Sequence, residues 1–287
     1  MKKFDVTALG ELLVDFTENG MSAQGNPLLE ANPGGAPCNV LSMLQNLGKK
    51  TAFIGKVGAD MFGTMLTQAV KDQGINIDNL VTDDTVHTTL AFVHTGVDGD
   101  RDFSFYRNPG ADMMLREEEI QQEIFADTKI FHFGTLSMTD LRMEQVTKHA
   151  VKKAKEQGAV ISFDPNLRPP LWKKLGDAAD KMWYGISQCD ILKISDDEIS
   201  FLTGTADIDQ GIGKIMEQYC PALICATMGK DGSKAYYKGK SVYAEPFLQK
   251  NTIETTGAGD TFMACILNTV LDKGINGLSE NDMYEML

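Results

Sequence analysis

The sequence predicts an α/β fold, in which a Rossmann-like, doubly wound and mostly parallel sheet carries a small β lid. From about residue 112 onwards, strand-like apolar runs alternate with amphipathic helices, which is typical of parallel sheets. Polar segments follow these runs directly, as ligand-binding loops do at the carboxyl edge of such a sheet. The stretches at about 12–33 and 86–110 break the pattern and are predicted to form the lid. No linker divides the chain, so residues 1–287 are predicted to form one domain.

Hydrophobic runs that end at glycines or polar residues predict the individual elements. In the first half they predict strands at Phe4–Leu9 and Thr51–Ile54, lid strands at Val86–His94 and Asp102–Arg107, and helices that end at Gly48 and Gly74. The segment Gly55–Gly58 is expected to turn into the second of these helices. In the second half the expected strands and helices are Lys129–Phe133, Asp140–Gln157, Ala159–Phe163, 171–187, Asp190–Ile194, Asp196–Leu202, Ile208–Tyr219 and Ala222–Ala226.

The composition argues against several classes of partner. The net charge is -13, from 27 Lys and Arg against 40 Asp and Glu, and this opposes binding to nucleic acid or to an anionic membrane surface. The five cysteines are scattered and lack Cys-x-x-Cys spacing, as expected for reduced thiols in a cytoplasmic protein. No apolar stretch is long enough to span a bilayer, and the four histidines show no metal-binding spacing.

The segment Thr255–Thr261 combines two glycines, an aspartate and the start of an apolar helix. Gly257 and Gly259 let the backbone turn tightly, and the first amides of the following helix lack intrahelical acceptors. Such a turn binds anions such as phosphate. Because Asp260 would repel that anion, it suits a general base that takes the proton of an attacking hydroxyl. The alternative is that Asp260 only caps the helix.

Polar groups near the first strand and the next helix predict a site for a polyol. Asp15 follows the first strand and either accepts hydrogen bonds from sugar hydroxyls or is a solvated carboxylate. Gly34 and Gly35 either permit close approach of a ligand or simply form a turn. Asn39, in the helix that follows, is expected to direct its amide into the same crevice as Asp15.

Three later strand ends carry further candidates. Asp164–Arg168 follows a buried strand, and Arg168 is suited to clamp a phosphate. Ser195–Glu198 has the pattern of a capping box, and Glu198 is also placed to bind a hydrated Mg²⁺; the two roles are compatible. Thr227–Ser233 forms either a wall of a nucleotide site or a simple hairpin.

These motifs, in this order and spacing, resemble those of the ribokinase-like (PfkB) carbohydrate kinases over nearly the whole chain. Within that family the chain is similar to bacterial fructokinases, through Gly10–Phe16, Phe105–Asp112 and Asp164–Pro169. The resemblance implies a ribokinase-like fold and transfer of the ATP γ-phosphoryl group to the terminal hydroxymethyl of a sugar, fructose above all. The alternatives are another acceptor (2-keto-3-deoxygluconate, a nucleoside or an aminoimidazole riboside) and a truncated sugar-binding homologue with weak catalysis.

The resemblance also implies a role for each motif residue. Asp260 is the general base, and Gly257, Ala258 and Gly259 build the anion hole. The residues implied to contact the sugar are Asp15, Gly34, Gly35, Asn39, Arg107, Arg168 and Asp260. Those implied to contact the nucleotide are Lys193, Thr227, Gly229, Gly232, Gly257 and Gly259. Mg²⁺ is expected near Glu198, through water, and near Asn166.

Three features depart from the family pattern. Ser195–Glu198 keeps the glutamate of an Asn-x-x-Glu metal motif but lacks its asparagine. Glu254 stands where an aspartate is usual, which weakens the prediction of a monovalent-cation (K⁺) site. The chain ends at Leu287, so a C-terminal family segment of roughly 20 to 30 residues is expected to be missing. The expected partners are a sugar and ATP, with a homodimer formed through the lid edge Val86–Val93.

Overall fold

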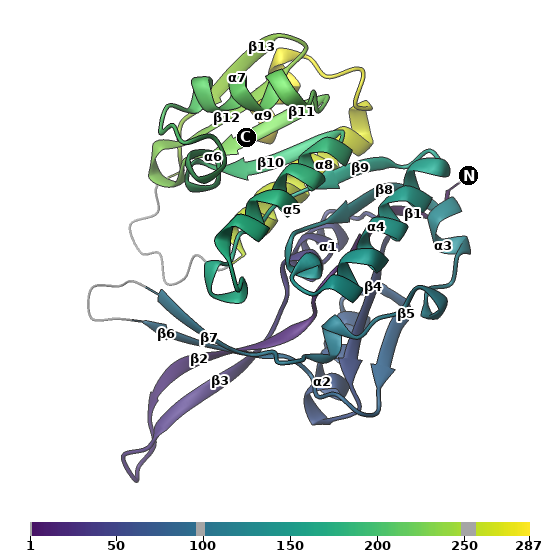
Figure 1. The fold of residues 1–287 in the computed structure, drawn as a ribbon, viewed down its shortest axis with the longest axis vertical. Helices are drawn as coiled ribbons and strands as arrows, with labels where there is room; N and C mark the ends of the chain where they lie inside the picture. Colours follow the sequence, from purple (N-terminus) through teal and green to yellow (C-terminus); the bar gives the residue numbers. More distant parts are fainter. Residues whose placement is uncertain (1, 96–100, 248–256) are drawn as a thin grey trace.

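A large, mostly parallel sheet forms the body of the molecule in the computed structural model, which describes residues 2–95, 101–247 and 257–287. Among these residues it has nine strands in the order β13-β12-β11-β10-β9-β8-β1-β4-β5 (Figure 1). Only the pairings of β11 with β12 and of β12 with β13 are antiparallel. The strands are β1 Phe4–Leu9, β4 Thr51–Gly58, β5 Asn76–Asp83, β8 Thr128–Phe133, β9 Val160–Phe163, β10 Ile191–Ser195, β11 Leu223–Thr227, β12 Ser233–Tyr237 and β13 Lys240–Ala244.

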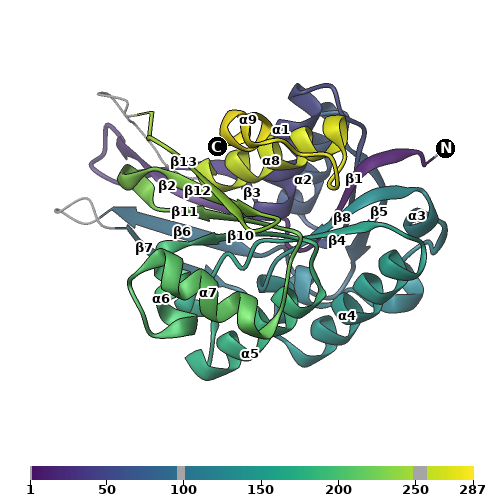
Figure 2. The ribbon, with the colours of Figure 1, turned by 90° about the horizontal axis from the view of Figure 1, so that it is seen from above.

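Helices cover both faces of this sheet and bury a separate apolar cluster on each (Figure 2). One face is covered by α1 Ala36–Asn46, α2 Met61–Asp72, α8 Ala258–Lys273 and α9 Glu280–Met286. The other face is covered by α4 Leu141–Glu156, α5 Leu175–Gln188, α6 Asp196–Thr203 and α7 Ile208–Gln218, with the short α3 Glu123–Ala126 beside α4. This layering confirms the predicted doubly wound α/β fold.

The alternation of side chains along the strands decides which residues face which cluster. In β10, Leu192 and Ile194 pack in the cluster under α4–α7, whereas Ile191 packs in the cluster under α1 and α8. Because successive side chains of a strand point to opposite faces, Lys193 lies on the same side as Ile191. This register places the Lys193 ammonium below the start of α8, where the site is built.

A second, four-stranded sheet projects from the body (Figure 1), in the order β3-β2-β6-β7. Its strands are β2 Leu13–Met21, β3 Pro27–Gly34, β6 Leu90–Thr95 and β7 Arg101–Tyr106. They fall within the two stretches expected to form a lid. The predicted edge at Val86–Val93 is wrong, because β6 lies between β2 and β7 and the free edges belong to β3 and β7. Residues 96–100, between the two predicted lid strands, lie outside the described residues.

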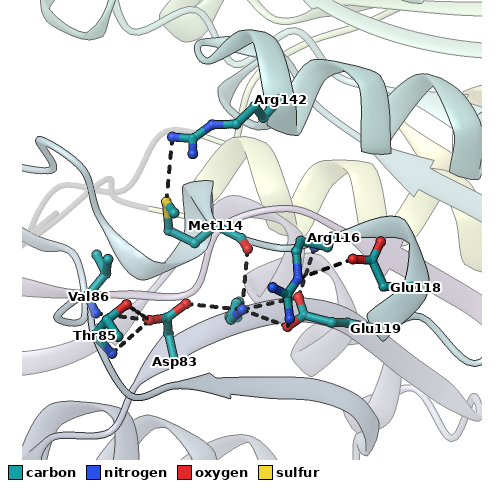
Figure 3. Close-up of polar contacts among 9 residues, drawn as sticks. Asp83, Thr85, Val86, Met114, Arg116, Glu118, Glu119 and Arg142 are labelled. Atoms are coloured by element: carbon teal, nitrogen blue, oxygen red, sulfur yellow. Dashed lines mark hydrogen bonds and ion pairs between the residues drawn. The ribbon is translucent and has the colours of Figure 1, made fainter.

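The expected turn at Gly55–Gly58 is also wrong, because β4 continues to Gly58 and pairs with the unforeseen strand β5. Lys56 in this extension is buried, and its ammonium lies 3.0 Å from Asp83 Oδ2 and 2.9 Å from Glu119 Oε1. Figure 3 shows these two carboxylates, with Arg116 bonded to the second one. Burial disfavours the charge of Asp83, but hydrogen bonds from Thr85 and Lys56 hold its pKa well below the usual range. The ion pairs therefore fasten the edge of the sheet to the 3-10 segment Glu117–Glu119.

Candidate active site

The site is organised by the first turn of α8. Gly257 precedes the helix with a left-handed φ of +79°, a conformation that glycine adopts without strain. The amides that open the helix have no intrahelical acceptors and carry the positive end of its dipole, as an anion hole requires. A Cβ at Gly259 would lie only 3.0 Å from Lys193 Nζ. Because Gly259 has no side chain, the Lys193 ammonium can lie close to the amides of the first turn of α8. The preceding Thr255, Thr256 and Glu254 lie outside the described residues.

Asp260 is buried in this turn and is held from two directions. The amide of Asn39, on α1, donates to its Oδ2 over 2.8 Å. The amide of Asn166, after β9, donates to its Oδ1 over 3.4 Å. The N-cap of the helix is Gly257, and Asp260 is the third residue of α8. Its carboxylate is thus oriented by two asparagine side chains, one of which, Asn39, also lines a cavity, and this suits a general base better than a cap.

A buried ion pair lies beneath the anion hole. Lys193 Nζ is 3.1 Å from Asp164 Oδ2, and both residues are almost inaccessible to solvent. Burial raises the pKa of Asp164 by more than Lys193 lowers it. Burial also opposes the charge of Lys193, but the carboxylates of Asp164, Glu198 and Asp260 together raise its pKa. The lysine therefore stays cationic, close to the amides that would meet a phosphoryl group.

Glu198 braces the loop that connects Asp164 with Asn166. Its Oε2 accepts a hydrogen bond from the Ser195 amide at 2.9 Å, and the Ser195 hydroxyl accepts one from the Glu198 amide, which confirms the predicted capping box. Its Oε1 accepts a hydrogen bond from the Leu167 amide at 2.8 Å. Each oxygen keeps a second lone pair, so Glu198 fits a contact to metal-bound water. The described residues contain no group of three or more His, Cys, Asp or Glu arranged to hold a metal directly.

A cavity of ≈ 370 Å³ opens between the small sheet, α1 and the start of α8. It brings together four of the predicted residues, namely Asp15, Gly34, Asn39 and Gly257. Sequence reasoning missed other polar residues that line it, namely Thr17, Asn32, Ser42, Asn46 and Thr261. Strand alternation was the available signal for Thr17, because it lies two residues after Asp15 on the same face of β2.

Gly34 is essential to the shape of this cavity, because a Cβ there would lie 2.1 Å from Asp15 Oδ2. We expect Gly34→Ala to displace the Asp15 carboxylate and to raise the KM of the sugar by about 10- to 100-fold, as lost hydrogen bonds to a charged group predict. The KM of the nucleotide should be unchanged. Steady-state kinetics with each substrate varied in turn measure both, and Gly213→Ala, in open space on α7, is the matched control. An unchanged sugar KM would remove Asp15 from the sugar site.

Arg107 does not line the cavity. It is buried at the end of β7, where its guanidinium bonds to Asp112 Oδ2 (2.7–2.8 Å), Thr139 Oγ1 (2.7 Å) and the carbonyl oxygen of Leu136 (3.0 Å). Its donors therefore fasten the root of the small sheet to the body. Arg168 is half-buried, with Nη1 3.3 Å from the carbonyl oxygen of Leu167. The sugar contacts assigned to both arginines stay predictions.

Glu11, at the carboxyl end of β1, is a buried carboxyl that sequence reasoning did not single out. Its Oε1 accepts a hydrogen bond from the Ala36 amide at the start of α1, over 2.9 Å. Burial raises its pKa from 4.5 to about 7, although Arg107 opposes the shift. The backbone of Gly35 packs on it so closely that a Cβ there would lie 2.4 Å from the Glu11 carbonyl oxygen. Gly35 thus serves the close contact of α1 with β1.

This raised pKa predicts a pH-dependent loss of stability. Between pH 4.5 and 7 the unfolded chain releases the Glu11 proton more readily than the folded one, so the free energy of unfolding falls as pH rises. From pH 5 to pH 8, we expect the wild type to lose about 2–3 kcal/mol more than Glu11→Gln, which keeps the Oε1 acceptor. Urea unfolding of both proteins at the two pH values measures this difference. Parallel losses in the two proteins would show that Glu11 does not titrate in this range.

The residues predicted to contact the nucleotide lie at two neighbouring strand ends. Thr227 ends β11 and is in register with Ser195, at the end of β10. Gly229 and Gly232 follow with left-handed φ values of +52° and +87°. At Gly232 a Cβ would lie 2.3 Å from the carbonyl oxygen of Ala244, so this turn is also required by the packing of β13. Their contact with a nucleotide stays a prediction.

The fold and these motifs identify a class of protein. A model of the pfkB family carbohydrate kinases matches residues 3–281, and the chain belongs to that family. Probable fructokinase-2 of Arabidopsis thaliana is 40% identical over 275 residues, which cover 93% of this chain and 82% of that relative. None of the helices in the described residues is long and apolar enough to cross a membrane.

Solved structures of fructokinases share the architecture. One from Xylella fastidiosa with bound ATP has a TM-score of 0.85 and 33% identity, covering 95% of this chain and 83% of its own. A double-mutant fructokinase from Vibrio cholerae, bound to fructose, ADP and potassium ion, has a TM-score of 0.87 and 25% identity, covering 100% of this chain and 89% of its own. The ribokinase-like fold expected from the sequence is thereby confirmed.

Proposed function

We propose that this protein is an ATP-dependent fructokinase that converts fructose to fructose 6-phosphate. The observation that carries the proposal is the position of Asp260, which lies in the first turn of α8 and is hydrogen-bonded to Asn39, a residue that lines a cavity with a carboxylate, amides and hydroxyls. That arrangement offers a base to a sugar hydroxyl and an anion hole to a phosphoryl group. The 40% identity to a probable fructokinase supports the choice of sugar.

The reaction follows from this geometry. Asp15, the backbone at Gly34 and Asn39 bind the sugar so that its terminal hydroxyl faces Asp260. The hydroxyl oxygen attacks the γ-phosphorus, the bond from that phosphorus to the β–γ bridging oxygen breaks, and the hydroxyl proton passes to Asp260. The amides of Ala258, Gly259 and Asp260 and the ammonium of Lys193 stabilise the charge on the transferring group. The small sheet acts as a lid that excludes water.

The family reaction implies a metal with the nucleotide, and we assign it as Mg²⁺. Glu198 fits as a hydrogen-bond acceptor for metal-bound water. The amide nitrogen of Asn166, by contrast, faces Asp260 and acts there as a hydrogen-bond donor. When bound, Mg²⁺ would neutralise charge on the ATP phosphates. The potassium ion in the Vibrio cholerae fructokinase supports a monovalent-cation site here as well.

The lining of the cavity favours a neutral sugar. None of the described residues that line it is Lys, Arg or His, and Arg107, which does not line it, donates to Asp112, Thr139 and Leu136. An acidic acceptor such as 2-keto-3-deoxygluconate would bring its carboxylate close to the carboxylate of Asp15, and the two like charges would repel each other. Fructose, which is uncharged and rich in hydroxyls, is matched by the amides and by Asp15.

A coupled assay of ADP release tests the function. With Mg²⁺ and ATP, we expect release that depends on fructose, exceeds a no-sugar blank, and is much weaker with 2-keto-3-deoxygluconate, a nucleoside or an aminoimidazole riboside. Release with another acceptor but not with fructose would reassign the substrate. A folded protein that is inactive with every acceptor but melts at higher temperature with sugar would be a sugar-binding homologue.

We further propose a cytoplasmic homodimer, consistent with the five unpaired cysteine thiols. The small sheet offers the contact surface, since Phe16, Phe92 and Tyr106 pack together on its face opposite the cavity and Tyr106 is 69% exposed. Light scattering coupled to gel filtration decides between a monomer and a dimer. Tyr106→Ser should shift a dimer toward the monomer.

A further inference from the structure

Asn166 adopts a backbone conformation that is uncommon for a residue with a side chain. Its φ is +49°, and among the described residues only Lys238 shares a positive φ without being glycine. Asparagine tolerates this region better than most residues, but glycine occupies it with less strain. The conformation persists only where the surroundings hold it in place, and such residues cluster at functional sites.

The surroundings of Asn166 do hold it. On one side, the carbonyl oxygen of Pro165 accepts hydrogen bonds from Thr135, from the hydroxyl at 2.6 Å and the amide at 3.1 Å. On the other side, the Leu167 amide donates to buried Glu198 over 2.8 Å. Two residues upstream, Asp164 is paired with Lys193. Three elements of the body thus fix the loop on which Asn166 stands.

The side chain that this loop presents points to the Asp260 carboxylate. Its amide nitrogen is 3.4 Å from Oδ1, while the Asn39 amide is 2.8 Å from Oδ2. The two donors come from different elements, Asn166 from the loop after β9 and Asn39 from α1. With one donor on each oxygen, the plane of the Asp260 carboxylate is fixed. A single donor would leave the carboxylate free to rotate about χ2.

We propose that Asn166 is a positioning residue for the general base, an inference that rests on the proposed kinase function. Asn39 lines the sugar cavity, so its amide is shared between Asp260 and the incoming sugar. Asn166 is not among the residues that line that cavity, and it keeps its contact with Oδ1 while the substrate hydroxyl approaches. Hydrogen bonds of this kind are often long without substrate and shorten in the reactive complex. The amide thereby aims the base at the hydroxyl proton.

The test exploits the positive φ. Asn166→Gly keeps the backbone conformation and removes only the amide, so folding and melting temperature should be preserved. We expect kcat for fructose phosphorylation to fall about 10- to 100-fold, with the KM values of fructose and ATP nearly unchanged, as expected for a misaligned catalytic group. Lys238→Gly relieves the same backbone strain in the turn between β12 and β13 and should leave kcat unchanged.

Asn166→Asp distinguishes positioning from a structural role. Aspartate has almost the same shape and tolerates positive φ, so a purely structural role would place its activity near the wild type and above that of Asn166→Gly. Positioning predicts the opposite order, because a carboxylate facing Asp260 repels it and kcat falls below that of Asn166→Gly. Wild-type turnover in the same assay tests the kinase function separately. Wild-type kcat in Asn166→Gly, or an Asp variant more active than the Gly variant, would overturn the proposal.

Discussion

Asp260→Asn is expected to lower kcat for sugar phosphorylation by roughly 10²–10⁴-fold, the usual contribution of a general base. The substituted amide keeps the size of the side chain and one of the two acceptor oxygens that face Asn39 and Asn166, but it cannot accept the hydroxyl proton. Sugar binding should change little, because the cavity residues are untouched. The measurements are kcat from coupled ADP release and the sugar Kd from calorimetry.

A matched control exists on the same helix. Asp272 lies near the end of α8, is half-exposed, and is ion-paired to Lys49 at the surface. Asp272→Asn removes the same charge from the same element without approaching the anion hole, so its kcat should equal that of the wild type. If Asp260→Asn retains most of the turnover, Asp260 is not the base and its contacts with Asn39 and Asn166 serve the structure only.

Much of the fold could be predicted because its strands are buried on both faces and are continuous in hydrophobicity. The edge strand Asn76–Asp83 was not predicted, because only parts of it are buried and its sequence is rich in Asn and Asp rather than continuously hydrophobic. The continuation of β4 through Gly55–Gly58 escaped because it depends on partners distant in sequence. Lys56 there is paired with Asp83 and Glu119, and no local pattern reveals those contacts.

The site shows the same division between local and distant information. The turn at Gly257–Asp260 is a local motif, so its position and its helix could be predicted from spacing. The contact of Asn39 with Asp260 joins residues 221 positions apart and depends on how α1 and α8 pack. The sugar contact predicted for Arg107 comes from the family resemblance, whereas its pairing with Asp112 depends on the tertiary structure and could not be predicted.

Lys193→Met is expected to lower kcat/KM for ATP by about 10²–10³-fold, because it removes a cation preorganised beside the anion hole. It also leaves Asp164 buried without its partner, which typically destabilises a protein by about 3–5 kcal/mol. Burial already raises the pKa of Asp164, so the variant can keep that carboxyl protonated in acid. The loss of stability should therefore be smaller at pH 5 than at pH 8, as urea unfolding at the two pH values would show.

The double variant Lys193→Met with Asp164→Asn separates the two effects. Removing both charges leaves no unpaired ion, so much of the lost unfolding free energy should return, since neutral replacements of buried ion pairs are often well tolerated. The activity should not return, because no cation faces the phosphoryl group. Recovery of kcat/KM together with stability would mean that Lys193 acts only by neutralising Asp164. Continued loss of activity in a stable protein would establish that the ammonium acts on the nucleotide itself.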